Sequence, residues 1–194
     1  MAYNIYVDWN DFDALAEVFE ENRDQIAAVI GQPYMHGNFM DNQMPEKDFW
    51  QKVRKLCDDT GTVLIIDDVR AGFRMDLAGS DHYFGFKADL ICFCKALANG
   101  YNVSALCGQA HMKNVVSGLN VTGSYWLSAV PFAAGIACIQ KLKRLHQAWV
   151  AECQKRGVYF TNHHNHFINA ALSDEDIRET IEIAGEAFAA LKER

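Results

Sequence analysis

The chain lacks three features that would place it in a membrane, on a secretory route or on nucleic acid. No apolar run among its 194 residues approaches the length of a membrane-spanning helix. The first residues contain no basic segment followed by an apolar core, so no signal peptide is expected. Lysine and arginine number 18 against 25 aspartates and glutamates, giving a net charge of -7. This charge argues against a general nucleic-acid or anionic-membrane surface. We therefore expect a cytoplasmic protein without nucleic-acid or membrane partners.

A disulfide framework and a metal site are also not indicated. Six cysteines are spread along the chain, mostly in apolar surroundings, which is typical of buried free thiols in a cytoplasmic protein. His163, His164 and His166 lie close together near the end of the chain. They lack a cysteine or carboxylate partner at metal-ligand spacing, so this cluster is a weak signal. We expect no bound metal.

Helical and strand patterns alternate along most of the chain. Apolar spacing predicts helices over residues 11–19, 45–60, 128–153 and 173–191, the last two capped by Ser128 or Ser124 and by Ser173. Short apolar runs predict strands over 26–31, 63–66, 88–94 and 104–107, with two more at 158–160 and 167–168. The alternation predicts an α/β fold with a mainly parallel sheet.

Two groups of opposite charge follow neighbouring buried strands. Val63–Ile66 leads into Asp67, and Ala88–Cys94 leads into Lys95. The carboxyl ends of strands in an open α/β sheet are where ligands are held. An amine and a carboxylate at such an edge are the two groups that pyridoxal phosphate chemistry requires. Partial burial of the lysine at its strand end would favour the uncharged, nucleophilic amine.

These motifs together resemble the class III aminotransferases of fold type I, in particular the glutamate-1-semialdehyde aminomutase-like branch. The resemblance covers residues 61–74 and 88–100, and extends to the segments 122–126 and 163–167. It implies part of the large cofactor-binding domain over residues 1–156, followed by a short α+β remnant of the small domain over 157–194. It also implies pyridoxal 5'-phosphate as cofactor, and transamination or an amino shift on a small amino acid or amino-ketone.

The resemblance assigns roles to five residues. Lys95 would form the Schiff base and shuttle the substrate proton, and Asp67 would pair with the pyridine nitrogen. Val69 would pack against the ring, while Gly123 and Ser124 would bind the phosphate across a dimer interface. Each residue also has a structural interpretation: Lys95 as a surface lysine, Asp67 as a turn aspartate, Val69 as a core residue, and Gly123 and Ser124 as part of a helix cap.

Four further positions bear on the substrate. Arg70 and Arg74 could bind a carboxylate bidentately or form structural ion pairs. Gln32 stands where many relatives have an acidic residue, close to the expected active-site wall, so it leaves substrate identity open. Asp68 stands where many relatives have glutamate.

The chain is roughly half as long as a complete enzyme of this family, and a second gap is expected near residues 143–148. The resemblance implies that a glycine-rich phosphate cup and a ring-stacking aromatic are missing. A shortened sheet leaves strand edges and apolar faces open, so we expect a homodimer or a complex with a chain that supplies the missing half. The alternative is a catalytically inactive or split fragment that works as an oligomerising binding module.

Overall fold

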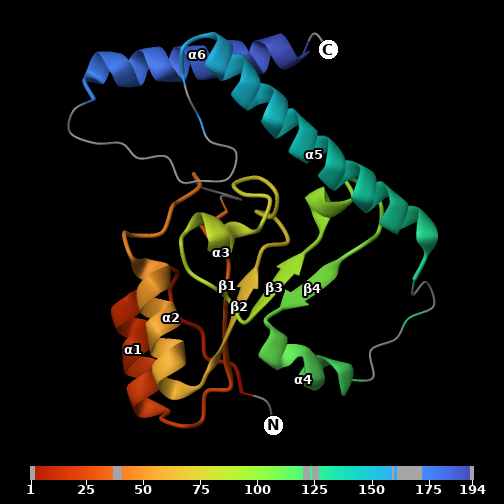
Figure 1. Ribbon diagram of the computed structural model, residues 1–194. Helices are drawn as coiled ribbons and strands as arrows, with labels where there is room; N and C mark the ends of the chain where they lie inside the picture. Colours follow the sequence, from red (N-terminus) through yellow and green to blue (C-terminus); the bar gives the residue numbers. More distant parts are fainter. Residues whose placement is uncertain are drawn as a thin grey trace. The chain divides into compact units, whose positions relative to one another are not determined.

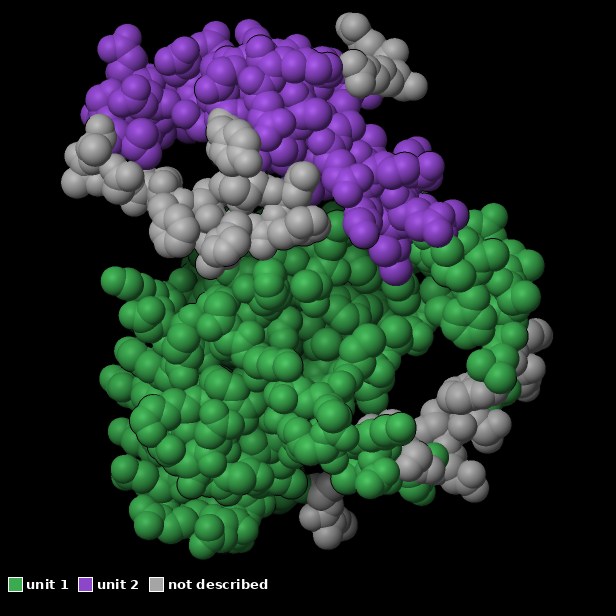
Figure 2. Space-filling view, viewed as in Figure 1, with its two compact units in different colours: residues 1–136 green, residues 137–194 purple. Residues whose placement is uncertain are grey.

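The computed structural model describes residues 3–36, 41–119, 123, 127–158, 160 and 172–192. Figure 1 shows the order of the elements along the chain. The chain divides into two compact units, residues 1–136 and 137–194, coloured separately in Figure 2. The predicted domain boundary after residue 156 stays a prediction; the compact units divide earlier, inside a long helix.

A four-stranded sheet forms the centre of the first unit. Its strands are β1 (Ala28–Gly31), β2 (Val63–Asp67), β3 (Leu90–Phe93) and β4 (Ala105–Gly108), and they lie side by side in chain order. β1, β2 and β3 are parallel, and β4 pairs with β3 in the antiparallel direction. Apolar strands with crossover segments between them give this arrangement. The predicted fold class, a mainly parallel α/β sheet, is confirmed.

Helices α1 (Phe12–Glu21) and α2 (Phe49–Thr60) cover one face of the sheet. The short elements α3 (Ser80–Tyr83), η1 (Lys95–Leu97), η2 (Ala110–Met112) and α4 (Lys113–Ser117) lie in the segments that follow β2, β3 and β4 along the chain. Figure 1 shows α1 and α2 lying next to each other beside the strands. The core consists of apolar side chains of α1, α2, β2 and β3, including Phe19, Trp50, Val53, Leu64 and Ile66.

Helix α2 begins later than the sequence suggests. Pro45 was expected to open it, but the helix begins at Phe49 after an N-cap at Asp48 with φ of 61°. The expected end is confirmed, since Gly61 adopts φ of 69° and its N–H bonds back to the last turn. Proline fits a first helical turn, but it also fits the extended segment before a helix, so its position does not set the start.

The two faces of the sheet differ in burial. Leu64, Ile66 and Ile91 face the core and are buried, with Leu64 and Ile66 at 0% exposure. On the other face, Ile30 of β1 is 65% exposed and Leu106 of β4 is 52% exposed. Sheets with parallel strands are usually covered on both sides. Unit 1 therefore leaves an open apolar face, which we call the open sheet face.

The second unit is helical in its described part. It holds residues from 137 onward of α5 (Ala129–Lys155), together with α6 (Asp174–Lys192). Trp149 of α5 stacks on Phe188 of α6 at a centroid distance of 5.0 Å. Its indole N–H donates to the carbonyl of Ala184 at 3.1 Å. Cys153 of α5 and Ala187 of α6 are also fully buried.

The predicted N-cap of the last helix, Ser173, is confirmed. Ser173 and Asp176 exchange hydrogen bonds, with Asp176 N–H donating to Ser173 Oγ and Ser173 N–H donating to Asp176 Oδ2. The two predicted terminal strands fall mostly on residues outside the described ranges. Within the described part, no helix is long and apolar enough to cross a membrane.

Candidate functional site

A cavity of about 330 Å³ lies at the carboxyl edge of the sheet, where β1, β2 and β3 end. Its lining comes from the segments that follow these three strands: Gln32, Met35 and His36 after β1, Asp67, Val69 and Arg70 at and after the end of β2, and Lys95 after β3. Parallel strands bring their carboxyl ends to one edge, which is why residues far apart in sequence meet here. The predicted group of Asp67, Val69 and Lys95 lies together in one cavity.

Asp67 and Asp68 are neighbours in sequence and have different surroundings. Asp67 is half-buried, and its Oδ1 accepts a hydrogen bond from Val69 N–H at 3.1 Å, which fixes the carboxylate in an Asx turn beside the cavity. Asp68 is fully buried, and its two oxygens accept from Ser80 N–H at 2.9 Å and Ser80 Oγ–H at 2.5 Å. Burial raises the pKa of Asp68, and the Ser80 hydrogen bonds oppose that shift. Asp68 therefore anchors the loop, and Asp67 faces the cavity.

A tight turn holds the rest of this loop in place. Gly72 N–H donates to the Asp68 carbonyl at 2.7 Å, and Arg74 Nε donates to the Arg70 carbonyl at 2.7 Å. A Cβ on Gly72 would lie 2.7 Å from the Phe93 ring, so only glycine fits there. The backbone that carries Arg70 is thus fixed from both sides.

Lys95 occupies an unusual backbone conformation directly after β3. Its φ is +34°, in the left-handed region that non-glycine residues seldom adopt. Leu97 N–H donates to the Cys94 carbonyl and Asn99 N–H donates to the Lys95 carbonyl, which together hold the turn. Backbone strain of this kind concentrates at ligand-binding and catalytic positions. The expected partial burial of Lys95 is not found in this chain, because its side chain is exposed where it stands after the last residue of the strand.

Three contacts fix the segment after β1. Trp50 Nε1–H donates to the carbonyl of buried Pro33 at 2.8 Å, and Trp9 Nε1–H donates to the Gln32 carbonyl at 3.3 Å. Met35 and Gln43 form an isolated antiparallel bridge through two backbone hydrogen bonds. His36 follows at once, so its position on the cavity wall is set by anchored backbone.

His36 is the functional candidate that sequence reasoning missed. Its ring packs edge-on against Tyr34 at a centroid distance of 4.3 Å, and its Nε2 is enclosed without a hydrogen-bond partner among the described residues. Burial lowers the pKa of His36. The nearby positive charges of Arg70, Lys95 and Arg74 lower this pKa further, and the negative charge of Asp67 raises it. The imidazole is therefore neutral at pH 7. The sequence offered one indication of this role: His36 follows shortly after the strand predicted over residues 26–31.

Gly123, one of the two predicted phosphate-binding residues, does not line this cavity in the single chain. Gly123 is exposed, and a Cβ built on it would contact nothing within 4 Å. Ser124 lies outside the described residues, as do His163, His164 and His166. The roles of Gly123 and Ser124 stay predictions. Within the described ranges, no group of three histidine, cysteine or acidic side chains could hold a metal ion.

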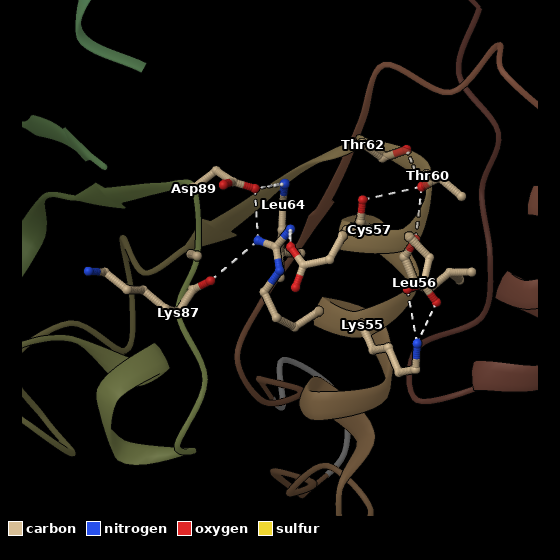
Figure 3. A network of polar contacts seen from close by, with 12 residues as sticks. Lys55, Leu56, Cys57, Thr60, Thr62, Leu64, Lys87 and Asp89 are labelled. Atoms are coloured by element: carbon tan, nitrogen blue, oxygen red, sulfur yellow. Dashed lines mark hydrogen bonds and ion pairs between the residues drawn. The ribbon is translucent and has the colours of Figure 1, made fainter. Parts of the chain in front are cut away.

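The opposite edge of the sheet carries a polar network around Asp89, shown in Figure 3 with Leu64 and the last turns of α2. Asp89 Oδ2 accepts from Leu64 N–H and from Arg54 Nη1–H, each at 2.8 Å, and Oδ1 lies 3.3 Å from His111 Nε2. Burial raises the pKa of Asp89, but the hydrogen bonds from Leu64 and Arg54 outweigh it and hold the pKa below its usual value. This network ties α2, β2 and β3 together.

The sequence of residues 7–186 matches the family model described as aminotransferase class-III. The chain belongs to this family. Pyridoxal phosphate is the cofactor of the family, and the cavity residues named above lie within the matched range.

Relatives and solved structures agree with this assignment. The chain is 32% identical to the aminopentol aminotransferase of Sphingopyxis macrogoltabida, over 96% of this chain and 56% of the relative. It is 34% identical to the glutamate-1-semialdehyde 2,1-aminomutase of Alkaliphilus oremlandii, over 75% of this chain and 34% of that enzyme. The FumI protein of Sphingopyxis sp. MTA144, solved with pyridoxal phosphate, superposes with a TM-score of 0.67 at 32% identity, covering 97% of this chain and 57% of that one.

The chain spans about half or less of the length of these curated relatives. The match to the aminopentol aminotransferase runs over 235 residues, although this chain has 194. The relative therefore has residues inside the matched region that have no counterpart here, as the sequence predicted. Their expected place near residues 143–148 stays a prediction.

The cavity fits the ring end of pyridoxal phosphate. An exposed primary amine, a carboxylate and an apolar side chain line a single space, and the carboxylate is oriented by its own turn. The residues that would hold the phosphate are not identified among the described cavity residues.

Proposed function

We propose that this chain carries the amine and carboxylate centre of a pyridoxal phosphate-dependent aminotransferase or aminomutase. The observation that carries the proposal is the convergence of Asp67, Val69 and Lys95 on one cavity. When bound there, the cofactor supplies an aldehyde for the amine and a ring that accepts electrons. The substrate would be a small amino acid or amino-ketone.

Each of the three residues has a distinct task in this proposal. Lys95 presents the primary amine, and its exposed side chain is free to bond to the aldehyde and afterwards to move a proton at the substrate carbon. Asp67 places a carboxylate against the ring nitrogen and keeps that nitrogen protonated. Val69 offers an apolar contact to one ring face. The strained backbone at Lys95 is consistent with a position selected for function rather than for stability.

Absorbance spectroscopy tests the proposal directly. Purified chain titrated with pyridoxal phosphate should develop a visible band that Lys95→Ala abolishes, and borohydride should fix the adduct at Lys95 in a peptide mass spectrum. Lys87→Ala is the matched control, because Lys87 is an exposed lysine of the same unit that does not line the cavity. A band that persists unchanged in Lys95→Ala, or no band at all, would overturn catalysis by this chain alone.

A second chain is part of the proposal. Ile30 and Leu106 on the open sheet face are 65% and 52% exposed, and the chain covers only 56% of the aminopentol aminotransferase. Exposed apolar faces of this kind mark association surfaces. The partner would be a second copy in a homodimer, or a chain that supplies the missing half.

The six free cysteines support a cytoplasmic location.

Sedimentation velocity tests the association. The chain should sediment as a dimer or larger species, and Leu106→Lys should shift it towards the monomer. Leu77→Lys is the control, because Leu77 is 38% exposed in the segment between β2 and α3 and belongs to no strand. A monomer at all concentrations would remove the homodimer from the proposal.

The open sheet face also favours a second candidate function, an oligomerising binding module without catalysis. If the chain forms oligomers that Leu106→Lys disrupts and shows no Lys95-dependent absorbance band, the binding module is favoured. Association together with the band would favour the enzyme.

A further inference from the structure

A serine that lies outside the cavity is bonded to the residue next to Asp67. Ser80, at the start of α3, donates to both carboxylate oxygens of Asp68, through its N–H at 2.9 Å and through its hydroxyl at 2.5 Å. Ser80 is 1% exposed and Asp68 is 0% exposed, so bulk water does not compete for these hydrogen bonds. The proposed chemistry gives neither residue a task.

Asp68 fixes the peptide plane that orients the cavity carboxylate. Its carbonyl and the N–H of Val69 belong to one planar peptide unit. The carbonyl accepts from Gly72 N–H at 2.7 Å, and the N–H donates to Asp67 Oδ1 at 3.1 Å. Because the Asp68 side chain is held by Ser80, this peptide plane is anchored at its carbonyl and at the side chain before it. The Asx turn of Asp67 thus depends on its buried neighbour.

Ser80 is itself held from the other side by contacts near β3. Gly79 before it adopts φ of +118°, and a Cβ there would lie 2.9 Å from Ile91 Cδ1, so a larger residue does not fit. Asp81 after it accepts from Ala88 N–H at 3.2 Å, which ties α3 to the segment leading into β3. The two donors of Ser80 are therefore at a fixed position.

Loss of the Ser80 hydroxyl would leave one oxygen of a buried carboxylate without its donor. Burial raises the pKa of Asp68, and the Ser80 hydrogen bonds oppose that shift. An unpaired buried carboxylate oxygen is costly, so the side chain gains free energy by turning towards water. That movement would rotate the peptide between Asp68 and Val69 and withdraw the N–H that orients Asp67.

We propose that Ser80 is a positioning residue, which acts through buried Asp68 to hold the Asp67 carboxylate in its ligand-binding orientation. The inference rests on the proposed function, in which Asp67 faces the ring nitrogen of pyridoxal phosphate. Ser80 itself does not line the cavity. Its effect is to reduce the conformational freedom that the Asp67 carboxylate would otherwise lose when the ligand binds.

Amide hydrogen exchange in the full chain without cofactor measures this orientation. Ser80→Ala should accelerate exchange of the Val69 amide about 10-fold or more relative to exchange of the Leu64 amide. Leu64 N–H donates to Asp89 at the other end of the same strand, so it reports any general loss of stability. Equal acceleration of the two amides, or acceleration of neither, would show that Ser80 only stabilises the fold and would overturn the proposal.

Three further variants make the exchange result specific. Ser80→Thr keeps the hydroxyl and should return the Val69 exchange rate towards that of the wild type. Ser80→Cys keeps the shape of the side chain with a weak donor, so it should follow Ser80→Ala and replaces that variant if the alanine protein does not fold. Ser104→Ala removes a hydroxyl from an exposed position before β4 and should change neither amide.

A double-mutant cycle tests whether the effect reaches the ligand. Pyridoxal phosphate binding is followed by the Lys95-dependent absorbance band. Ser80→Ala should weaken binding about 5-fold in the wild-type background and should cause no further loss when Asp67→Asn is already present. Equal losses in the two backgrounds would mean that Ser80 does not act through Asp67, and would overturn the proposal.

The two measurements separate this inference from the proposed function. If the wild-type chain shows no absorbance band, the proposed function fails, and the exchange of the Val69 amide still decides whether Ser80 orients Asp67. A normal band together with unchanged Val69 exchange in Ser80→Ala would overturn this inference and leave the proposed function intact.

Discussion

The two edges of the central sheet use their aspartates in opposite ways. At the amino edge, Asp89 accepts hydrogen bonds from Leu64 N–H and Arg54, and its side chain is 10% exposed. At the carboxyl edge, Asp67 is half-buried, accepts a backbone hydrogen bond from Val69 N–H and lines a cavity. The first arrangement joins a helix to two strands, and the second leaves a carboxylate available to a ligand.

Residues that stabilise the fold and residues that can bind a ligand thus lie at opposite ends of the same strands. Buried charges with complete hydrogen bonds stabilise a fold only as a set, since removing one partner leaves the other unpaired. A cavity carboxylate with few protein partners contributes little to folding and retains its capacity for a ligand. Substitutions at the two edges should therefore affect different measurements.

The largest expected effect is at the amino edge. Asp89→Ala should lower the free energy of unfolding by about 3 kcal/mol, because it leaves Leu64 N–H without its acceptor and leaves Arg54 with only Asp58 as an ion-pair partner. Asp67→Ala should lower it by about 1 kcal/mol or less, because one hydrogen bond is lost. Urea denaturation followed by circular dichroism measures both.

A surface pair calibrates that comparison. Lys55 and Asp59 form an ion pair whose side chains are 74% and 57% exposed, so Lys55→Ala should cost about 0.3 kcal/mol. Equal losses in Asp67→Ala and Asp89→Ala would erase the contrast between the edges.

A smaller loss of stability is expected when the hydrogen bond to buried Asp68, next to Asp67, is removed. Ser80→Ala removes the hydroxyl that donates to Asp68 and should destabilise the chain by about 1–3 kcal/mol. Ser104→Ala, at an exposed position before β4, should stay within about 0.5 kcal/mol. Thermal unfolding of both variants gives the comparison. A Ser80→Ala protein as stable as the Ser104 control would mean that Asp68 does not anchor the loop.

The smallest effect is a difference in pH dependence. The folded-state pKa of Asp89 lies below its usual value, so its stabilisation is present above the unfolded pKa near 3.9 and is lost as pH falls through the lower folded value. The pKa of Asp68 is raised, so its contribution is present at low pH and is lost as pH rises through the raised value.

Urea unfolding from pH 3 to 7 measures this contrast. The stability gap between wild type and Asp89→Asn should narrow as pH falls, and the gap between wild type and Asp68→Asn should narrow as pH rises. Two gaps that move in the same direction would contradict the assigned environments.

Much of the fold could be predicted, because buried strands are short apolar runs that polar residues and glycine punctuate. The runs before Asp67 and Lys95 gave both strands and their shared edge. The start of α2 was misplaced, because Pro45 fits an extended segment as well as a helix. Lys95 was expected to be partly buried, but the burial of a side chain depends on its neighbours in space, which the local sequence does not specify.

The cavity could be predicted only in part for a similar reason. Asp67 and Lys95 were found because each directly ends a strand. His36 escaped notice because its proximity to Arg70 follows from the pairing of β1 with β2 and from the bridge between Met35 and Gln43. Its enclosed Nε2 is a property of packing, which one sequence does not display.

The order of the strands has a consequence for synthesis of the chain. Since each strand pairs with the one made before it, the sheet can be extended strand by strand as the polypeptide leaves the ribosome, without waiting for distant segments. The cavity is completed when β3 docks on β2 and carries Lys95 to the edge where His36 and Asp67 already stand. Once β4 has emerged from the ribosome, the nascent chain thus has a sheet and a cavity wall that can already be assembled.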